Sequence, residues 1–357
     1  MRSILVTPNL LGYDGISCLS RQLLRALPQP AVVLSLHDTP SHDHEGRRSA
    51  GGSRARFLAD AARVSMGADR ETVVVCSHVH LAPVARVLAW RGSPFVQVLC
   101  GIEAWVPLRR AERWAAGASR LVAISQHTAD RFKGANADLA DASIEVCHPG
   151  LPVEGPQAGH TGSLDGQPPG VLVVGRMARD EGYKGHELLI DLWPHVLELH
   201  PDARLWMVGD GDDRARLESL ARTRDVAAAI VFTGRIPDEA LEALYRRCRF
   251  FVLPSRHEGF GLVFLEAMRA GKACIGARGA AEEIIDHGRT GLIVDPSRPE
   301  QVWDAIVKLL DDPIRCDAFG RAGAARFAGA FTDAHFANRL APVLAHESCE
   351  VAHALVR

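Results

Sequence analysis

The sequence contains no C-x-x-C pair, no long apolar run and almost no net charge. Its eight cysteines are scattered, and most lie in or beside apolar runs. This is typical of reduced core thiols in a cytosolic protein and argues against a disulfide framework. A formal net charge of -2 argues against a nucleic-acid-binding protein, because such proteins carry a broad basic surface.

No run approaches the ~18 consecutive apolar residues that a membrane-spanning helix needs. The first ten residues, MRSILVTPNL, include no apolar segment long enough for a secretory signal. We therefore expect a protein that is made and kept in the cytoplasm. Lysine is also scarce, since only four of the 41 basic residues are lysines: Lys133, Lys184, Lys272 and Lys308.

The rest of the composition is that of an ordinary globular protein, with 47% hydrophobic and 24% charged residues. A length of 357 residues favours two domains, since single cores usually stop growing at about 250–300 residues. Short β-branched runs occur in two sets of six, with helical patterns such as HELLIDLWPHVLELH between them. Most runs are apolar on both faces, as in parallel strands covered by helices. The pattern predicts two Rossmann-like, doubly wound α/β domains.

One segment without a clear strand or helix pattern separates the two sets. HPGLPVEGPQAGHTGSLDGQPPG, residues 148–170, is rich in Gly and Pro, which is typical of a linker. We place the first domain at 1–150, the linker at 151–169 and the second domain at 170–335. The polar stretch 37–54 is expected to be a surface loop, and its histidines His37, His42 and His44 show no ordered ligand spacing.

Two cations follow the strand predicted at 171–175. Arg176 comes directly after it, and Lys184 lies just before the next predicted helix. In open parallel sheets ligands bind beyond the carboxyl ends of the strands, and the first amides of a helix attract anions. In a sequence so poor in lysine, Lys184 points weakly to a compact charge placed on a phosphate. The alternative is a solvated loop with ordinary surface charges. If only Arg176 and Lys184 are considered, this alternative is slightly favoured.

Two carboxylates bracket a glycine-containing turn in the stretch RHEGFGLVFLEAMRAG, residues 256–271. Gly259 and Gly261 permit a tight turn into a helix whose first amides could bind an anion. Glu258 lies on the turn, and Glu266 lies about one and a half turns into the helix, where an unpaired carboxylate is costly. Either acid alone would be interpreted as a salt-bridged core acid or a helix-start charge. The pair beside glycines favours hydroxyl binding by both.

Together these segments resemble glycosyltransferase family 4, a large group of retaining enzymes with the GT-B fold. Glu258 and Glu266 match the family's E-x7-E pattern, and VLVVGRMARDEGYKG resembles its Arg and Lys pair. WMVGDGDDRARLESL, VFTGRIPDEALEALYRRCRFFVLPS and IDHGRTGLIVDP follow its other segments in order. LLGYDGIS resembles the glycine loop after the first strand, and VQVLCGIEAW and RLVAISQHTADRF resemble two segments on the acceptor side. The similarity covers nearly the whole chain and is most specific at 171–296.

The resemblance implies two Rossmann-like domains facing across a cleft, with a last helix at about 336–357 that packs back on the first domain. Arg176, Lys184 and Glu258 would be the catalytic residues: the two cations neutralise the departing diphosphate, and Glu258 binds hydroxyls of the transferred sugar. Glu266 would bind the ribose hydroxyls. The other donor-binding residues would be Gly15, Arg235, Ile236, Gly259, Phe260, Gly261 and Leu262.

The family resemblance also implies retention of the anomeric configuration by front-face attack, with the phosphate accepting the proton of the acceptor. No separate carboxylate base is then required, so Glu258 is not a glycosidase-type nucleophile. The family commonly has a histidine where this sequence has Cys100. We place Cys100, Glu103 and His127 in the acceptor or sugar pocket. His78, His80 or His127 could compensate for the missing histidine, although ordinary surface or core histidines are the favoured interpretation.

No metal site and no cofactor are expected, the nucleotide sugar being the donor substrate. Asp210-Gly211-Asp212 has the Asp-x-Asp spacing that metal-dependent glycosyltransferases of another fold use for Mn²⁺. It follows the strand pattern LWMVG, where the resemblance expects a Gly-Asp-Gly turn, and we interpret it as a turn.

The sequence therefore predicts a retaining glycosyltransferase that moves a hexosyl unit from a nucleotide diphosphate sugar to a saccharide or lipid-linked saccharide. The alternatives are a nucleotide-sugar epimerase or hydrolase on the same fold, and a non-catalytic nucleotide-sugar-binding protein. RRAERW, with Arg109, Arg110 and Arg113 near Trp105 and Trp114, could lie against the inner face of an anionic membrane. A solvated helix face is the favoured interpretation of that segment.

Overall fold

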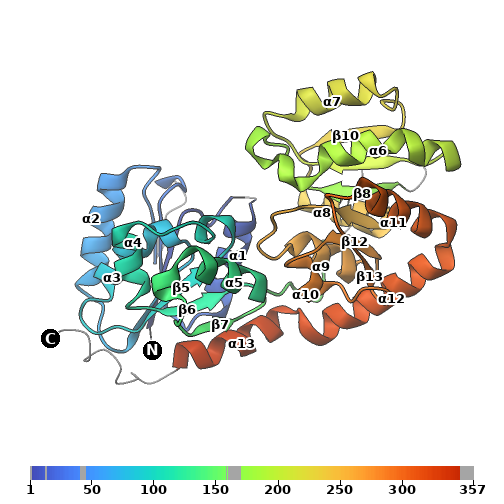
Figure 1. The fold of residues 1–357 in the computed structure, drawn as a ribbon. Coiled ribbons are helices and arrows are strands. Elements are labelled where there is room, and N and C mark those ends of the chain that lie inside the picture. The colour runs from blue at the N-terminus through green and yellow to red at the C-terminus, as the bar shows by residue number, and fades with distance from the viewer. Residues whose placement is uncertain (1, 13, 41–45, 158, 160–169, 346–357) are drawn as a thin grey trace. The chain divides into compact units, whose positions relative to one another are not determined.

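The computed structural model describes residues 2–12, 14–40, 46–157, 159 and 170–345 (Figure 1). Contacts divide it into two units: unit 1 consists of residues up to Gly150 together with Asp333–Ala345, and unit 2 runs from Leu151 to Thr332. Each unit holds one sheet of parallel strands with helices packed against it. The predicted class of two doubly wound α/β domains is confirmed. The predicted domain limits stay predictions, and most of 158–169 lies outside the described residues.

Unit 1 contains a seven-stranded parallel sheet in the order β3-β2-β1-β4-β5-β6-β7. All six strands predicted in this half are present. Five of them are short runs whose residues are mostly buried, whereas the edge strand β7 has no buried residue. The strands are β1 (Arg2–Thr7), β2 (Ala31–Ser35), β3 (Arg47–Ser49), β4 (Thr72–Cys76), β5 (Phe95–Leu99), β6 (Arg120–Ala123) and β7 (Ile144–Val146).

The helices of unit 1 form two groups. α2, α3 and α4 lie side by side, and a hydrophobic core that includes Phe57, Ala85 and Ala115 joins them to the sheet. α13 packs against α1, and Arg120 donates to the Val343 carbonyl at 2.6 Å. The helices are α1 (Gly15–Ala26), α2 (Arg54–Ser65), α3 (Ala82–Leu88), α4 (Arg110–Ala116), α5 (Gln126–Ala135) and α13 (Asp333–Ala345).

Two sequence predictions in unit 1 need correction or narrowing. The stretch 37–54 is not wholly a loop, because Arg47–Ser49 forms β3 and pairs in parallel with β2; a strand of three residues has too little pattern to be recognised. His42 and His44 lie outside the described residues. α13 begins at Asp333, three residues before the predicted start, and the remainder of the predicted helix, 346–357, lies outside the described residues.

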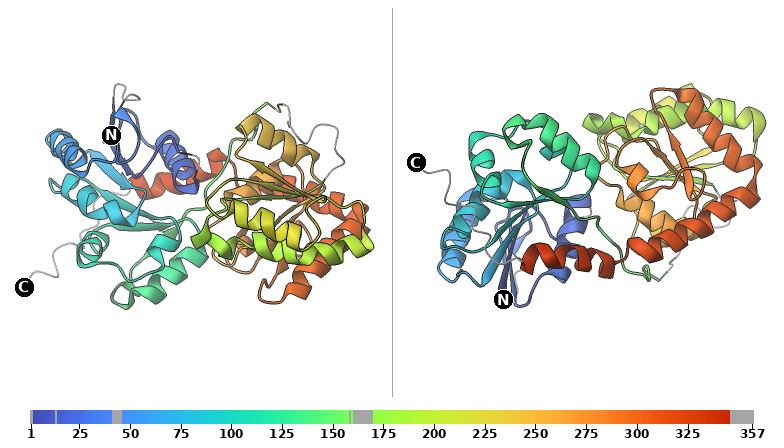
Figure 2. Two further views of the ribbon diagram at one scale, coloured as in Figure 1. Left: turned by 90° about the horizontal axis from the view of Figure 1, so that it is seen from above. Right: turned by 60° about the horizontal axis from the view of Figure 1, so that its bottom comes forward.

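Unit 2 contains a six-stranded parallel sheet in the order β10-β9-β8-β11-β12-β13, and all six predicted strands are found. The left view of Figure 2 looks along this sheet, with helices on both sides. The strands are β8 (Val171–Val174), β9 (Leu205–Val208), β10 (Ile230–Gly234), β11 (Phe251–Leu253), β12 (Cys274–Ala277) and β13 (Gly291–Val294).

The helices of unit 2 also pack in two groups, since α6 contacts α7 and α11, whereas α9 contacts α8, α10 and α12. The sequence analysis did not identify α12, whose weak amphipathic pattern reflects close packing through Gly320 and Gly323 against α9 and the turn after it. The helices are α6 (His186–Leu199), α7 (Arg214–Thr223), α8 (Asp238–Arg247), α9 (Leu262–Arg269), α10 (Ala281–Ile284), α11 (Pro299–Asp311) and α12 (Pro313–Ala330).

Candidate functional site

The strand order of unit 2 determines where a ligand can enter its sheet. β8 and β11 are neighbours, but the chain leaves β8 toward β9 and leaves β11 toward β12, on opposite sides. The loops that follow these two strands therefore diverge at the carboxyl edge, which is the usual ligand site of doubly wound sheets. We call the region between these two loops the crevice. The loop after β8 carries Arg176 and Lys184, and the loop after β11 carries Glu258 and Gly261.

An ion pair crosses this crevice. Lys184 Nζ lies 3.6 Å from Glu258 Oε2, and the two side chains are only 18% and 22% exposed. Lys184 ends a short 3-10 helix, Arg179–Lys184, and its ammonium also lies 5.7 Å from the centre of the Tyr183 ring. The sequence placed both residues in the site but did not predict that they would contact each other.

Glu258 has an unused acceptor. Its Oε2 atom is buried and accepts no hydrogen bond within the described part of the chain, although Lys184 lies within ion-pair distance of it. A buried carboxylate oxygen without a donor costs free energy, by about 1–3 kcal/mol or more for a charged group. A ligand hydroxyl is a chemically suitable donor. The geometry therefore fits the hydroxyl-binding role expected of Glu258.

Arg176 is held in place by an acid that the sequence analysis did not consider. Its Nε donates to Glu181 Oε2 at 3.0 Å, and Nη2 makes a second bond to Glu181 Oε1. The Glu181 hydrogen bond raises the pKa of Arg176. Burial opposes ionisation of Glu181, but the Arg176 hydrogen bond and the Lys184 charge outweigh it and lower the pKa of this carboxyl. Both groups are therefore charged, and the guanidinium is oriented before any ligand binds.

Glu181 could have been suspected from its position. It lies between the two predicted cations, in a loop at the carboxyl end of a strand, and the structure buries it to 9% exposure. A buried acid in such a loop needs a cation, and Arg176, Arg179 and Lys184 all lie within five positions of it.

The start of α9 provides backbone donors at the same edge. Gly261 is the N-cap residue with φ 99° and ψ 63°, and a Cβ there would lie 2.6 Å from Phe264 Cδ2, so a larger residue does not fit. Phe260 is buried at 2% exposure, and Leu262 begins the helix. The first amides of a helix have no acceptor within it, so this turn can donate to an anion. The crevice thus combines two cations, helix amides and an unused carboxylate oxygen.

Glu266 lies in the second turn of α9 and contacts α8 through Tyr245. The Tyr245 hydroxyl donates to Glu266 Oε2 at 2.8 Å. Burial raises the pKa of Glu266 to about 6, even though this hydrogen bond and the Arg269 charge lower it. The carboxylate is therefore mostly ionised at neutral pH and becomes protonated below about pH 6. Tyr245 was another residue that the sequence analysis did not single out.

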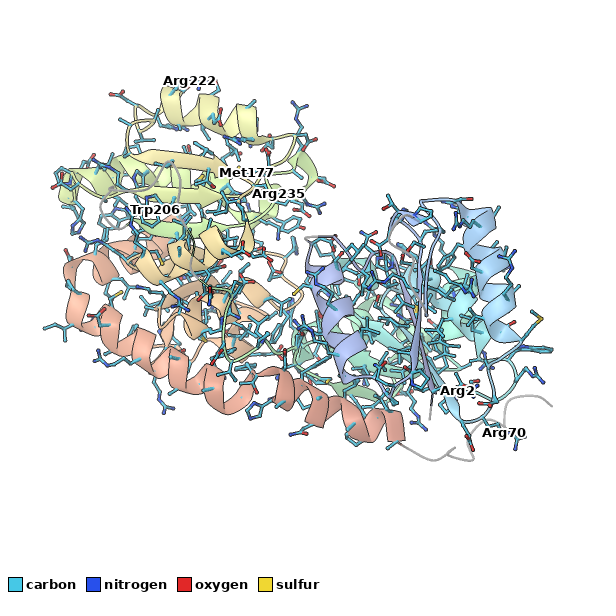
Figure 3. The ribbon with its side chains drawn as sticks, turned by 180° about the vertical axis from the view of Figure 1, so that it is seen from behind. Arg2, Arg70, Met177, Trp206, Arg222 and Arg235 are labelled. Atoms are coloured by element: carbon cyan, nitrogen blue, oxygen red, sulfur yellow. The ribbon has the colours of Figure 1, made fainter. Side chains whose placement is uncertain are left out.

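Arg235 and Ile236 follow β10 at the same edge of the sheet, where Figure 3 labels Arg235 together with Met177 of the loop after β8. Backbone hydrogen bonds connect the loops at this edge, from Gly209 to Gly234 at 3.1 Å and from Met177 to Asp210 at 3.0 Å. The two residues are thus placed beside the loop that carries Arg176. Their contact with a base stays a prediction.

Asp210-Gly211-Asp212 lies in the loop between β9 and α7, and a turn begins at Asp212. Asp210 accepts from the Gly211 amide at 2.9 Å, and Asp212 accepts from the Arg179 amide at 3.0 Å. Gly209 has φ 134°, and its backbone lies so close to the Gly175 carbonyl that no side chain fits. Across the described residues, no group of three or more His, Cys, Asp and Glu side chains is arranged to hold a metal ion.

In unit 1 the predicted pocket residue Cys100 follows β5 and is 9% exposed. Its thiol donates to the Ser77 carbonyl at 2.8 Å, and its amide donates to Glu103 Oε1 at 3.2 Å. Burial raises the pKa of the Cys100 thiol, with a further contribution from Glu103. Burial also raises the pKa of Glu103. The thiol is therefore protonated and hydrogen-bonded, which fits a residue that shapes a pocket.

Two histidines follow β4 beside these groups. His78 accepts from the His80 amide through Nδ1 at 3.3 Å, which places the proton of a neutral ring on Nε2. Burial and the His80 charge lower the pKa of His78 to about 4, so the ring is neutral. His80 Nδ1 lies 2.8 Å from Glu112 Oε1.

The other two predicted residues of unit 1 lie in the first turns of helices. Gly15 is the first residue of α1, where Asp14 caps the helix by accepting from the Ser17 amide at 2.9 Å. His127 lies in the first turn of α5 and stacks edge-on against Trp105, with ring centroids 5.2 Å apart. The structure brings Cys100 and Glu103 into contact, while the roles of Gly15 and His127 stay predictions.

The family profile described as glycosyl transferases group 1 matches residues 162–326. A GDP-mannose-dependent α-(1-6)-phosphatidylinositol monomannoside mannosyltransferase of Mycobacterium tuberculosis is 31% identical over 283 residues, covering 74% of this chain and 70% of that protein. An α-D-kanosaminyltransferase of Streptomyces kanamyceticus is 29% identical over 197 residues, covering 55% and 46%.

Solved structures show the same fold. Alr3699/HepE of Anabaena, in complex with UDP and glucose, superposes with a TM-score of 0.80 over 96% of this chain and 99% of that one, at 18% identity. Sucrose-phosphate synthase of Thermosynechococcus elongatus superposes with a TM-score of 0.73 over 96% and 98%, at 18% identity.

Proposed function

Since the chain belongs to the group 1 glycosyltransferases, we propose that it transfers a hexosyl unit to a saccharide or lipid-linked saccharide acceptor, with retention. The family and the GT-B fold agree with the resemblance to glycosyltransferase family 4, and the prediction of a nucleotide-sugar-dependent glycosyltransferase is confirmed. The observation that carries the finer proposal is the Lys184–Glu258 pair across the crevice, with its unused carboxylate oxygen.

The residues of the crevice suit the charge changes of such a transfer. As the bond from the anomeric carbon to the phosphate oxygen breaks, negative charge grows on the departing nucleoside diphosphate. Lys184, Arg176 and the first amides of α9 supply fixed positive charge for it. The acceptor oxygen then bonds to the anomeric carbon, and its proton goes to the departing phosphate. Glu258 binds sugar hydroxyls and does not act as nucleophile.

The names of the relatives suggest the first donors to test. The mycobacterial relative is named for GDP-mannose, and the Anabaena structure holds UDP and glucose. We therefore propose GDP-mannose and UDP-glucose as the leading candidates. Glu266 supports a nucleotide with free ribose hydroxyls, because its carboxylate is ionised at neutral pH.

A binding and turnover screen tests the proposal. Purified full-length protein is titrated with GDP-mannose and UDP-glucose, and products are analysed with and without phosphatidylinositol mannoside or simple alkyl mannosides. Acceptor-dependent formation of a new glycosidic bond supports transfer. Release of free sugar or of an epimer at the same rate without acceptor would favour the hydrolase or epimerase alternative, and binding without turnover would favour a non-catalytic protein.

A peripheral membrane contact is part of the proposal, because a lipid-linked acceptor lies at a membrane. None of the described helices is both long enough and apolar enough to cross a bilayer. The region formed by α2, α3, α4 and the turn after α3, called here the α2–α4 face, carries exposed apolar side chains: Val87 is 57% exposed, Trp90 71% and Trp114 55%. Trp105, which the sequence grouped with this surface, is buried at 7% and stacks on His127.

The same face is basic. Its only acids on the three helices, Asp60 and Glu112, are 6% and 5% exposed, and Arg86 lies 5.7 Å from the centre of the Trp114 ring. Arginine with interfacial tryptophan suits an anionic lipid surface. The arginines on or beside these helices are Arg54, Arg56, Arg63, Arg86, Arg91, Arg109, Arg110 and Arg113.

Vesicle sedimentation tests this contact. We expect binding to phosphatidylcholine vesicles that contain phosphatidylglycerol, little binding to phosphatidylcholine alone, and weaker binding at high salt. Trp90→Ala with Trp114→Ala should reduce binding without changing turnover on a soluble acceptor. Equal vesicle binding by this double variant and the wild-type protein would show that the α2–α4 face does not contact the membrane.

A further inference from the structure

A buried hydrogen bond joins α8 to the predicted nucleotide site on α9. The Tyr245 hydroxyl donates to Glu266 Oε2 at 2.8 Å, and Tyr245 is only 1% exposed. The Tyr245 ring packs against Phe251, with centroids 5.8 Å apart, so the hydroxyl is held in one place. Within the described residues, Glu266 Oε1 accepts no hydrogen bond. One carboxylate oxygen is therefore fixed by the protein, and the other remains for a ligand.

The charges around Glu266 act in opposite directions. Burial raises its pKa to about 6; the Tyr245 hydrogen bond and the Arg269 charge lower it, whereas Asp238 and Glu242 raise it. Tyr245, Asp238 and Glu242 belong to α8, and Arg269 lies one turn further along α9. Arg269 is itself bound to Glu242, Nη2 to Oε2 at 2.8 Å, so Glu242 competes for its charge. α12, which also packs against α9, does so through glycines.

Arg269 is shared between Glu242 and Glu266, so its charge stabilises the Glu266 carboxylate only in part. The hydrogen bond from the Tyr245 hydroxyl adds to this stabilisation and opposes the effect of burial on the Glu266 pKa. We propose that Tyr245 is the positioning residue of the nucleotide site: its hydroxyl orients Glu266 and keeps the carboxylate ionised, so that Oε1 can accept hydrogen bonds from the nucleotide ribose. This inference rests on the proposed function, because it assumes that Glu266 binds a nucleotide. Tyr245 acts through Glu266 and touches no substrate.

The pH dependence of nucleotide binding distinguishes this role from simple packing. A hydrogen bond to the ionised carboxylate lowers its pKa, so Tyr245→Phe should raise the pKa of Glu266 above 6. At neutral pH more of the carboxyl is then protonated and affinity falls. Well above both pKa values the carboxylate is ionised in either protein, and affinity recovers. A shift of one unit corresponds to about a tenfold loss of affinity on the acid side.

The experiment is a set of calorimetric titrations of the full-length protein with GDP and with UDP, across a pH series on both sides of 6. For the wild-type protein we expect affinity to fall as pH drops through about 6. For Tyr245→Phe the midpoint should move upward. Equal affinity, or a loss of the same size at every pH, would overturn the positioning role.

Two further variants guard against misinterpretation. Phe251→Leu loosens the packing around the Tyr245 ring but keeps the hydroxyl, so it should lower the melting temperature without moving the pH midpoint. If Tyr245→Phe does not fold, site-specific fluorotyrosine at position 245 keeps the side chain and makes the phenol a stronger donor. It should move the midpoint downward, and an unmoved midpoint would contradict the proposal.

Glu266→Gln separates failure of this inference from failure of the proposed function. It should weaken nucleotide binding and leave only the pH dependence of the terminal phosphate of GDP or UDP, which titrates at about pH 6 in every variant. Adding Tyr245→Phe to Glu266→Gln should then leave the pH profile unchanged. If Glu266→Gln leaves nucleotide affinity unchanged, Glu266 does not belong to the nucleotide site at all. If Glu266→Gln weakens binding but Tyr245→Phe does not shift the pH dependence of nucleotide affinity, Glu266 belongs to the nucleotide site and the positioning role of Tyr245 is wrong.

Discussion

The carboxyl edges of the two sheets differ in whether their acids contact a cation. In unit 2 the paired groups are kept charged: the hydrogen bond between Arg176 and Glu181 raises the pKa of the first and lowers that of the second. In unit 1 the pKa values of the groups His78, Cys100 and Glu103 beside the edge are all shifted in the direction that favours the neutral form. Burial raises the pKa of Cys100 and of Glu103, and burial with the His80 charge lowers the pKa of His78.

This difference follows from which charged groups are in contact at each edge. Unit 2 places cation and anion within contact, so burial is offset by attraction and ionised groups persist. Unit 1 buries Cys100 and partly buries Glu103, and neither group forms an ion pair among the described residues, so their charged forms are disfavoured. The first environment suits a charged diphosphate and the second suits uncharged hydroxyls, which supports the proposal that unit 2 binds the donor and unit 1 the acceptor.

Removing a cation of the charged edge should have the largest effect. Lys184→Ala and Arg176→Ala should each lower turnover by more than they weaken donor binding, because their charges matter most as the diphosphate leaves. Loss of a single group that stabilises transition-state charge typically costs about 10²–10³-fold in kcat. Steady-state kinetics at saturating and limiting donor separate the two quantities.

Lys308→Ala is the matched control, since Lys308 is exposed on α11 away from the crevice. Arg176→Ala also leaves Glu181 buried without its partner, so its melting temperature is measured first. If both variants turned over at the wild-type rate, the charged edge of unit 2 would have no part in leaving-group departure.

Glu266→Gln should have the next largest effect. It should weaken binding of the nucleoside diphosphate by about 1–3 kcal/mol, the range for losing a charged hydrogen-bond partner. The loss should be greatest at neutral and alkaline pH and small below about pH 6, where the wild-type carboxyl is itself protonated. Calorimetry checks this, and unchanged affinity in a folded variant would remove Glu266 from the site.

Cys100→Ala tests the neutral edge and should have a small effect. A protonated thiol is a weak hydrogen-bond donor, so donor binding and most of the transfer rate should remain, whereas Cys100→His could alter the choice of sugar. The thiol should also resist alkylation at mildly alkaline pH, because burial raises its pKa. Loss of transfer in Cys100→Ala, with folding and donor binding intact, would show that the thiol acts directly.

Chelation should have the smallest effect. Transfer should survive exhaustive treatment with EDTA, since Arg176, Lys184 and the helix amides supply the positive charge that a metal would bring. The measurement is the initial rate before and after treatment. Activity that disappears with chelator and returns with Mn²⁺ would instead assign a metal role to Asp210 and Asp212.

The sequence by itself determined the elements and the identity of the charged residues. Twelve strands were predictable because parallel strands covered on both faces are continuous apolar runs, and turn residues bound each one. Arg176, Lys184, Glu258 and Glu266 were recognisable because they follow such runs or carry the family's spacing. β3 and α12 escaped prediction, since the first has only three residues and the second lacks a strong apolar stripe.

Only the tertiary structure decided which of these residues contact each other. The strand order brings the loops after β8 and β11 together, and so pairs Lys184 with Glu258, which are 74 positions apart in the chain. Packing of α8 on α9 places the Tyr245 hydroxyl on Glu266. Such contacts depend on the direction in which each side chain leaves its element and on what is buried around it. Those quantities also determine the pKa values, because burial and partner distance arise only when the chain folds.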